Sequence, residues 1–348
     1  MAELPLAARR VFRLAGTTAL ALGVAYGIGT DLPFIAPIFA LMLTAPPAPP
    51  RGPKALAGLA LAITITLGVG PLLAPMLQNY PVTALLVAAV GIYLCNHLSI
   101  NLGKGPVATL LTMGITMVSA VATLSHALAV TVIESLAVAV VIAIVCQWIV
   151  YPWFPEAPSP SAPTPLPAHD PDAERWISLR ATLVVLPAYL LALTNPTLYL
   201  PVIMKSVTLG QQTSLVALRG AGGELLGSTC LGGIMAILFW FALGVSTNLW
   251  MFTLWMLLFG VFFASRFYQV VPSRFTPSFW MNAAVTMLIL LGSAVQDSAN
   301  DRDVYQAFAV RMSLFVAVTC YAFFAIMLLE RWRRRLAHGR GVIAVGEY

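Results

Sequence analysis

Long apolar runs, separated by short polar or proline-containing connections, occupy nearly the whole chain. A transmembrane helix needs about 20 predominantly apolar residues to cross the hydrocarbon core of a bilayer. Several shorter runs adjoin a neighbour through a tight turn such as Gln78–Pro81, which predicts antiparallel helical hairpins. We therefore predict about twelve membrane spans, near residues 11–29, 32–45, 55–77, 82–100, 106–123, 128–151, 180–195, 198–217, 222–244, 248–265, 278–295 and 304–329.

A proline-rich segment, Pro152–Pro171, divides these spans into two groups of six. It holds eight prolines together with Ser, Ala and Thr, a composition typical of a semi-rigid, solvated linker. The expected domains are a first six-helix unit, the linker, a second six-helix unit and a tail, at residues 1–151, 152–174, 175–335 and 336–348.

The two groups share a pattern of punctuating residues. An Arg opens each group, a Leu-Pro pair begins its second span, and a further Arg precedes its third span. The corresponding residues lie 167 or 168 positions apart, as Arg13 and Arg180, Pro33 and Pro201, and Arg51 and Arg219. Because six is an even number, both groups enter the membrane from the same side, so we predict a parallel repeat. The expected fold class is an all-α integral membrane protein built from two six-helix repeats.

Composition agrees with a membrane protein and charge gives its orientation. Of the residues, 59% are hydrophobic and 9% are charged, whereas soluble domains carry roughly 25% charged residues. Of the 19 Lys and Arg residues, 16 lie in or beside connections on one side of the predicted membrane. Basic connections mark the cytoplasmic side, so we expect both termini there. The net charge of +6 then reflects orientation and contact with anionic lipid, and we expect no nucleic-acid partner.

Three charged residues fall inside apolar runs at a similar depth, namely Lys205, Arg311 and Glu134. Ionisable residues within a membrane are costly and mark functional sites by default. A Lys and an Arg facing a cavity would attract a carboxylate, and a desolvated Glu134 could carry a proton during transport. The alternative is that Glu134 and Arg311 form an ion pair that only holds two helices together. Lys205 could also extend its amine to the membrane surface.

Polar residues continue beyond Lys205 and predict either a water-filled path or hydrogen bonds between helices. They are Thr208, Gln211 and Gln212, with Asn282 a further candidate on another span. Arg219 and Glu224 could form a gate pair near the cytoplasmic side, although charges that merely orient a helix are more common there. The four cysteines lie far apart in apolar runs, so we predict no metal site.

No phosphate-binding loop, nucleophile–base pair or cofactor motif is present, so we expect neither an enzyme nor a cofactor. The Gly-rich element Arg219–Gly233 is similar to an "RxxGTxxG" element of the fusaric acid resistance/aromatic acid exporter superfamily. Arg311, early in the last span, also resembles a basic residue of that superfamily. Long members carry a sizeable cytoplasmic domain after each six-span half, whereas this chain has only the short linker.

The resemblance implies a bacterial inner-membrane exporter of aromatic or related organic acids that works with a periplasmic adaptor of the membrane-fusion type. We expect secondary, proton-coupled export and leave a homo-oligomer open. A passive organic-anion channel is the first alternative, because the fold class also resembles plant malate-type anion channels. A membrane scaffold without transport activity is the second, although a scaffold would not need a lysine inside the membrane.

Overall fold

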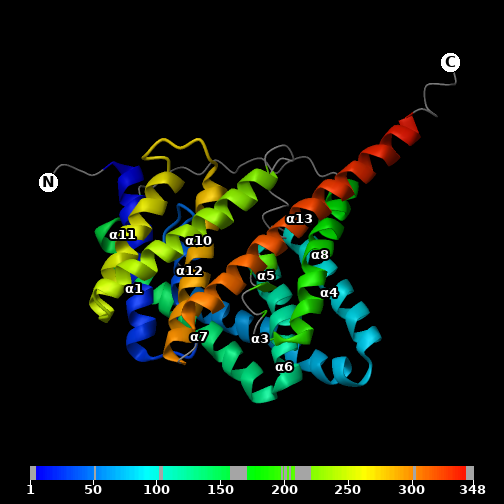
Figure 1. Ribbon diagram of the computed structural model, residues 1–348, viewed down its shortest axis with the longest axis horizontal. Coiled ribbons are helices and arrows are strands. Elements are labelled where there is room, and N and C mark those ends of the chain that lie inside the picture. The colour runs from blue at the N-terminus through cyan, green and yellow to red at the C-terminus, as the bar shows by residue number, and fades with distance from the viewer. Residues whose placement is uncertain are drawn as a thin grey trace.

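The computed structural model describes residues 5–50, 52–101, 105–156, 171–196, 199, 202–203, 205–207, 221–300 and 303–341. Every regular element among them is a helix (Figure 1). The helices are α1 (Leu6–Ile28), α2 (Ile35–Thr44), α3 (Pro53–Asn79), α4 (Pro81–Asn101), α5 (Gly105–Met113), α6 (Ser119–Leu124), α7 (His126–Val150), α8 (Pro171–Thr194), α10 (Ala221–Val245), α11 (Leu249–Phe267), α12 (Pro277–Ala299) and α13 (Val304–Gly341). A π-helix, Gly114–Val118, joins α5 to α6, and a short 3₁₀-helix, Tyr151–Trp153, follows α7.

Nine helices in the described part of the chain are long and apolar enough to cross a membrane. A helix satisfies its own backbone hydrogen bonds, which is why apolar sequences of this length cross lipid as helices. The chain is therefore a multi-pass membrane protein. Helix α2 has 10 residues and spans only about 15 Å, half the thickness of a hydrocarbon core. Of the predicted span 198–217, residues 199, 202–203 and 205–207 are helical and the rest lies outside the described residues.

The predicted helix positions agree with the structure more closely than the predicted helix ends. The turn between α3 and α4 falls at Tyr80, as expected from the sequence. Helix α8 begins at Pro171, nine residues before the predicted span, and α13 continues to Gly341, into the segment expected to be a tail. Both extensions are polar and carry charged helix-forming residues, which continue a helix beyond the membrane.

Helices from the two halves of the chain pack against each other. Helix α1 packs closely on α11, and α4 packs on α8. Helix α12 is the most enclosed span, with 83% of its most apolar stretch buried, whereas α3 and α4 have 22% and 28%. At Gly292 of α12, an added Cβ would lie 2.1 Å from the Cβ of Phe34, so only glycine permits this approach. The core of the molecule therefore surrounds α12, while α3 and α4 expose large apolar side chains suited to lipid.

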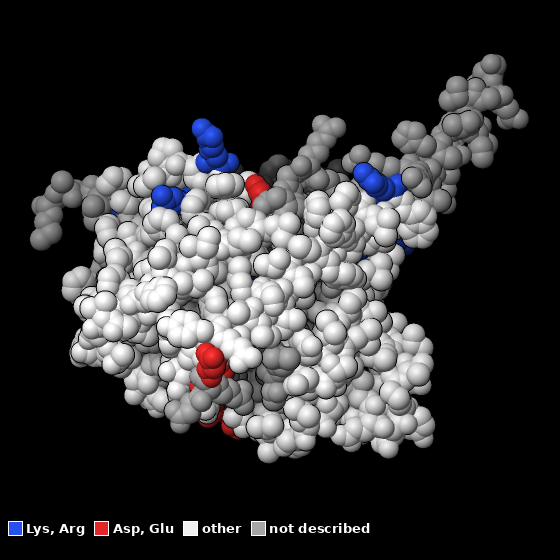
Figure 2. Space-filling model, viewed as in Figure 1, with Lys and Arg blue, Asp and Glu red and all other residues white. Residues whose placement is uncertain are grey.

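On the side of the molecule shown in Figure 2, charged side chains collect at the two ends and leave a largely uncharged band between them. Lys and Arg gather at the upper end in this view, where α1 begins and α13 ends. Asp31 and Asp303 lie in the turns at the opposite end, after α1 and before α13. We call these two ends the basic face and the acidic face. The largely apolar surface between the two faces is suited to contact with lipid, with Glu134 an exposed charge within the span formed by α7.

Candidate functional site: a buried lysine and its polar partners

Lys205 lies in the interior of the molecule, with none of its surface exposed. Its Nζ donates a hydrogen bond to Asn282 Oδ1 at 2.8 Å and another to Thr286 Oγ1 at 2.6 Å. Both partners are on α12 and are themselves buried. The amine therefore does not extend to the membrane surface, which excludes that interpretation of Lys205. A lysine enclosed in the interior of a membrane protein is unusual because burying an ammonium group is costly.

The partners of Lys205 are positioned by the regular geometry of α12 and by α10. Asn282 and Thr286 are four residues apart, so they lie on the same face of α12. Asn282 Nδ2 donates to Ser228 Oγ of α10 at 2.5 Å, and Thr286 Oγ1 donates to the Asn282 carbonyl at 2.7 Å. We call Lys205, Ser228, Asn282 and Thr286 the lysine cage. The hydrogen bonds of the lysine cage join three segments of the chain: the one that carries Lys205, α10 and the enclosed helix α12.

Close packing of α10 on α12 brings Ser228 to the lysine cage. One turn beyond Ser228, an added Cβ on Gly232 would lie 2.6 Å from the Ala283 carbonyl oxygen and 2.7 Å from Thr286 Cβ. A side chain at this position would push the two helices apart. Glycine in this part of α10 thus lets α10 approach α12 closely beside the cage, which is the small-residue packing typical of membrane helices.

Arg311 forms an ion pair, but with a different carboxylate from the one considered in the sequence. Its Nη2 donates to Asp297 Oδ1 at 3.1 Å, and Nη1 contacts Asp297 Oδ2. The Arg311 and Asp297 side chains are 13% and 5% exposed. Glu134 is exposed on α7 and makes no hydrogen bond to a described residue. The structure therefore places Arg311 in a pair between α12 and α13, and the Glu134–Arg311 pair is not formed.

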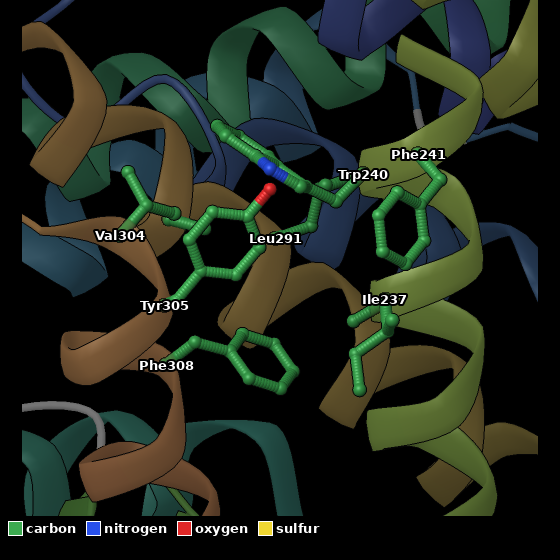
Figure 3. Close-up of a pocket in the computed structure, with 9 residues that line it drawn as sticks. Ile237, Trp240, Phe241, Leu291, Val304, Tyr305 and Phe308 are labelled. Atoms are coloured by element: carbon green, nitrogen blue, oxygen red, sulfur yellow. The ribbon is translucent and has the colours of Figure 1, made fainter. Parts of the chain in front are cut away.

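An apolar pocket of about 130 Å³ lies beside this ion pair, between α10, α12 and the start of α13. Figure 3 shows its aromatic side chains, with the Tyr305 hydroxyl pointing toward Trp240. Ala294 and Phe308 line the pocket one turn from Asp297 and Arg311, respectively. The sequence did not predict this pocket, because its lining comes from three separate helices.

The remaining predicted residues divide into those that the structure describes and those that it does not. Glu224 Oε2 accepts a hydrogen bond from Thr276 Oγ1 at 3.1 Å. The other member of the expected gate pair, Arg219, lies outside the described residues, as do Thr208, Gln211 and Gln212. Sequence reasoning missed Ser228 and Thr286, since a hydroxyl in a membrane helix commonly bonds its own backbone and gives no separate signal.

The lysine cage and the Arg311–Asp297 ion pair both involve polar residues of the enclosed helix α12, at two different heights along it. Asn282 and Thr286 occupy the half of α12 nearer the basic face, and Asp297 occupies its end at the acidic face. The Lys205 amine is the cationic donor of the cage, and an enclosed cationic donor of this kind suits a small anion such as a carboxylate.

Comparison with known proteins gives one match. Residues 10–150 match a family described as a protein of unknown function (DUF2955). No curated protein and no solved structure matches the chain. The matched segment begins in α1 and ends at Val150, the last residue of α7. The family description names no transport activity, and the chain is thus similar to an uncharacterised family over the helices that precede the proline-rich segment.

Proposed function

We propose that this protein is a secondary exporter of small organic acids in a bacterial inner membrane. The observation that carries the proposal is the lysine cage, in which a fully buried amine contacts Asn282 and Thr286. Neutral hydrogen bonds between helices would need no lysine, whereas an anion that passes through the membrane interior needs a cation to meet it. A substrate carboxylate would accept a hydrogen bond from Lys205 Nζ in place of the bond that Lys205 now donates to Thr286 Oγ1.

The proposed architecture is a pair of six-span repeats with both termini in the cytoplasm. Three observations support the repeat. The family match ends where α7 ends, at the predicted boundary between the repeats. Arg13 and Arg180 lie 167 residues apart and are both buried, on α1 and α8. The contact of α1 with α11 has a counterpart in that of α4 with α8, since each joins the first span of one unit to the fourth of the other.

Export would be driven by the proton gradient and would deliver the acid to a periplasmic adaptor, as the superfamily resemblance implies. Glu134 is the carboxylate proposed for proton coupling. It is exposed on α7 and makes no hydrogen bond to a described residue, and a carboxylate inside a membrane span marks a functional residue by default.

The test is efflux of benzoate and other carboxylates from loaded proteoliposomes that contain the purified protein. We expect Lys205→Met to slow benzoate efflux by about 10-fold or more, because hydrogen bonds to charged groups contribute about 1.5–3 kcal/mol. Arg274→Gln is the matched control, since Arg274 is an exposed cation on the basic face. A folded Lys205→Met variant with the wild-type rate would contradict the proposal.

The same assay separates export from passive conduction. We expect a proton gradient to accelerate wild-type efflux and Glu134→Gln to lose that acceleration. An organic-anion channel would be indicated instead if benzoate efflux were rapid, saturated poorly with benzoate concentration and did not depend on the proton gradient in either the wild type or Glu134→Gln.

A further inference from the structure

A second cluster of charges lies at the basic face, at the opposite end of α1 from the acidic turns. The carboxylate of Glu156, just after the 3₁₀-helix that follows α7, is held by two arginines of α1. Arg10 Nε donates to Glu156 Oε1 at 2.8 Å, and Arg13 Nη1 lies 2.8 Å from Glu156 Oε2. The Glu156 and Arg13 side chains are 7% and 1% exposed. Two guanidinium groups thus converge on one carboxylate that is almost removed from solvent.

Aromatic rings surround this cluster. Phe154 stacks on Phe12 with ring centroids 5.7 Å apart, and the Arg13 guanidinium lies 5.9 Å from the centre of the Tyr151 ring. Tyr268, at the end of α11, donates a hydrogen bond to the Ala45 carbonyl at 2.9 Å, at the end of α2. The ends of α1, α2, α7 and α11 therefore meet here, and the segment that carries Glu156 covers the arginines.

The guanidinium of Arg13 has donors that its ion pair with Glu156 does not satisfy. Its Nε, Nη1 and Nη2 are all buried, as is Glu156 Oε2, and none of these atoms makes a well-aligned hydrogen bond to a described residue, so Arg13 and Glu156 meet only as an ion pair. A buried donor without a partner costs about 1–3 kcal/mol, so a purely structural pair would be expected to satisfy them. Unused donors beside a carboxylate indicate a site that can hold a different or larger anion.

We propose that Arg10 and Arg13 form a second carboxylate-binding site, at the basic-face entrance, and that Glu156 occupies it as an internal competitor. The proposal rests on the proposed function, since it supplies the place where an organic acid would first bind. Glu156 lies outside the helices and is linked to α7 by only a short segment, so its carboxylate can leave the arginines without unfolding a span. A tethered competitor of this kind acts at an effective concentration of roughly millimolar or more.

The ionisation of Glu156 favours displacement by another anion over release by protonation. Burial raises the pKa of Glu156, but the hydrogen bonds and charges of Arg10 and Arg13 outweigh that effect and hold the pKa below its ordinary value. The carboxylate therefore stays ionised at neutral pH. An incoming carboxylate with the same charge can replace it on both arginines.

The experiment measures benzoate binding to the purified full-length protein by calorimetry. Glu156→Ala and Glu156→Gln are compared with the wild type, each also in a Lys205→Met background that removes the deeper cage. We expect both substitutions to lower the apparent Kd for benzoate by about 10-fold or more in both backgrounds, because the internal competitor is gone. Adding Arg13→Gln should abolish that gain, whereas adding Arg274→Gln should leave it.

The outcomes distinguish this inference from the proposed function. If Glu156→Ala and Glu156→Gln fold and bind benzoate no more tightly than the wild type, the pair only fastens the segment to α1 and the inference is wrong. A gain that survives Arg13→Gln would also overturn it. If Lys205→Met leaves efflux unchanged but Glu156→Ala tightens binding through Arg13, the proposed export site fails while the basic-face carboxylate site stands.

Discussion

At the scale of single residues, the pair between Arg311 and Asp297 can be tested by removing one charge or both. Asp297→Asn leaves the guanidinium of Arg311 without its carboxylate in a position that is only 13% exposed. Breaking a buried pair in this way typically costs about 3–5 kcal/mol, and we expect the lower end of that range. The double variant Asp297→Asn/Arg311→Met should recover most of the lost stability, which thermal unfolding in detergent would measure.

Efflux by the stable double variant decides whether Arg311 also contacts substrate. The sequence predicts that Arg311 binds the transported anion, and the structure shows only its pairing with Asp297 beside an apolar pocket. A double variant that regains stability but loses benzoate efflux would support a substrate contact. Wild-type efflux would assign Arg311 to structure alone.

How far single residues could be predicted depends on how rare their types are in membranes. Lys205 and Asn282 were predictable because a charge or an amide inside an apolar run is costly and therefore conspicuous. Ser228 and Thr286 were not, since hydroxyls are common in such helices and bond their own backbone. Glu156 was hidden by its place in a proline-rich segment, where a single carboxylate has no periodic context.

At the scale of helices, the packing of α10 on α12 predicts opposite effects for two substitutions on the same helix. Gly232→Ala would place a Cβ 2.6 Å from the Ala283 carbonyl oxygen and against Thr286, so we expect a loss of about 1–3 kcal/mol together with slower efflux. Gly244→Ala meets nothing within 4 Å and should be neutral or stabilising by about 0.5–1 kcal/mol. Equal thermal stability of the two variants would contradict close packing at Gly232.

Helix positions could be read from hydropathy, but irregularities within helices could not. The predicted span 106–123 contains a π-helical turn at Gly114–Val118, where an added Cβ on Gly70 of α3 would lie 2.4 Å from the Gly114 carbonyl oxygen. Such a turn reflects a contact between distant parts of the chain, so no local pattern of apolar residues reports it. Likewise, the fall in hydropathy marks where the apolar part of α13 ends, near Leu329. It does not mark the end of the helix at Gly341, because the polar residues in between remain helical.

At the scale of the whole molecule, the separation of charges predicts which side each face occupies. Basic connections are retained in the cytoplasm, so the basic face should lie there and the acidic face should lie outside. Single cysteines can report this in a variant without the four native cysteines. We choose Arg274→Cys and Lys54→Cys on the basic face, and Asn300→Cys and Asp31→Cys on the acidic face, because all four positions are exposed.

A membrane-impermeant maleimide applied to cells with a permeabilised outer membrane should label the cysteines at 300 and 31, and should reach those at 274 and 54 only after lysis. The agreement of two positions on each face guards against a single turn that reagents cannot reach. Labelling of 274 and 54 in unlysed cells would reverse the orientation. The carboxylate site of Arg10 and Arg13 would then open outward, and the direction of transport that it favours would be uptake. The orientation measurement therefore decides which side of the membrane the Arg10–Arg13 site faces, independently of whether either anion site binds its ligand.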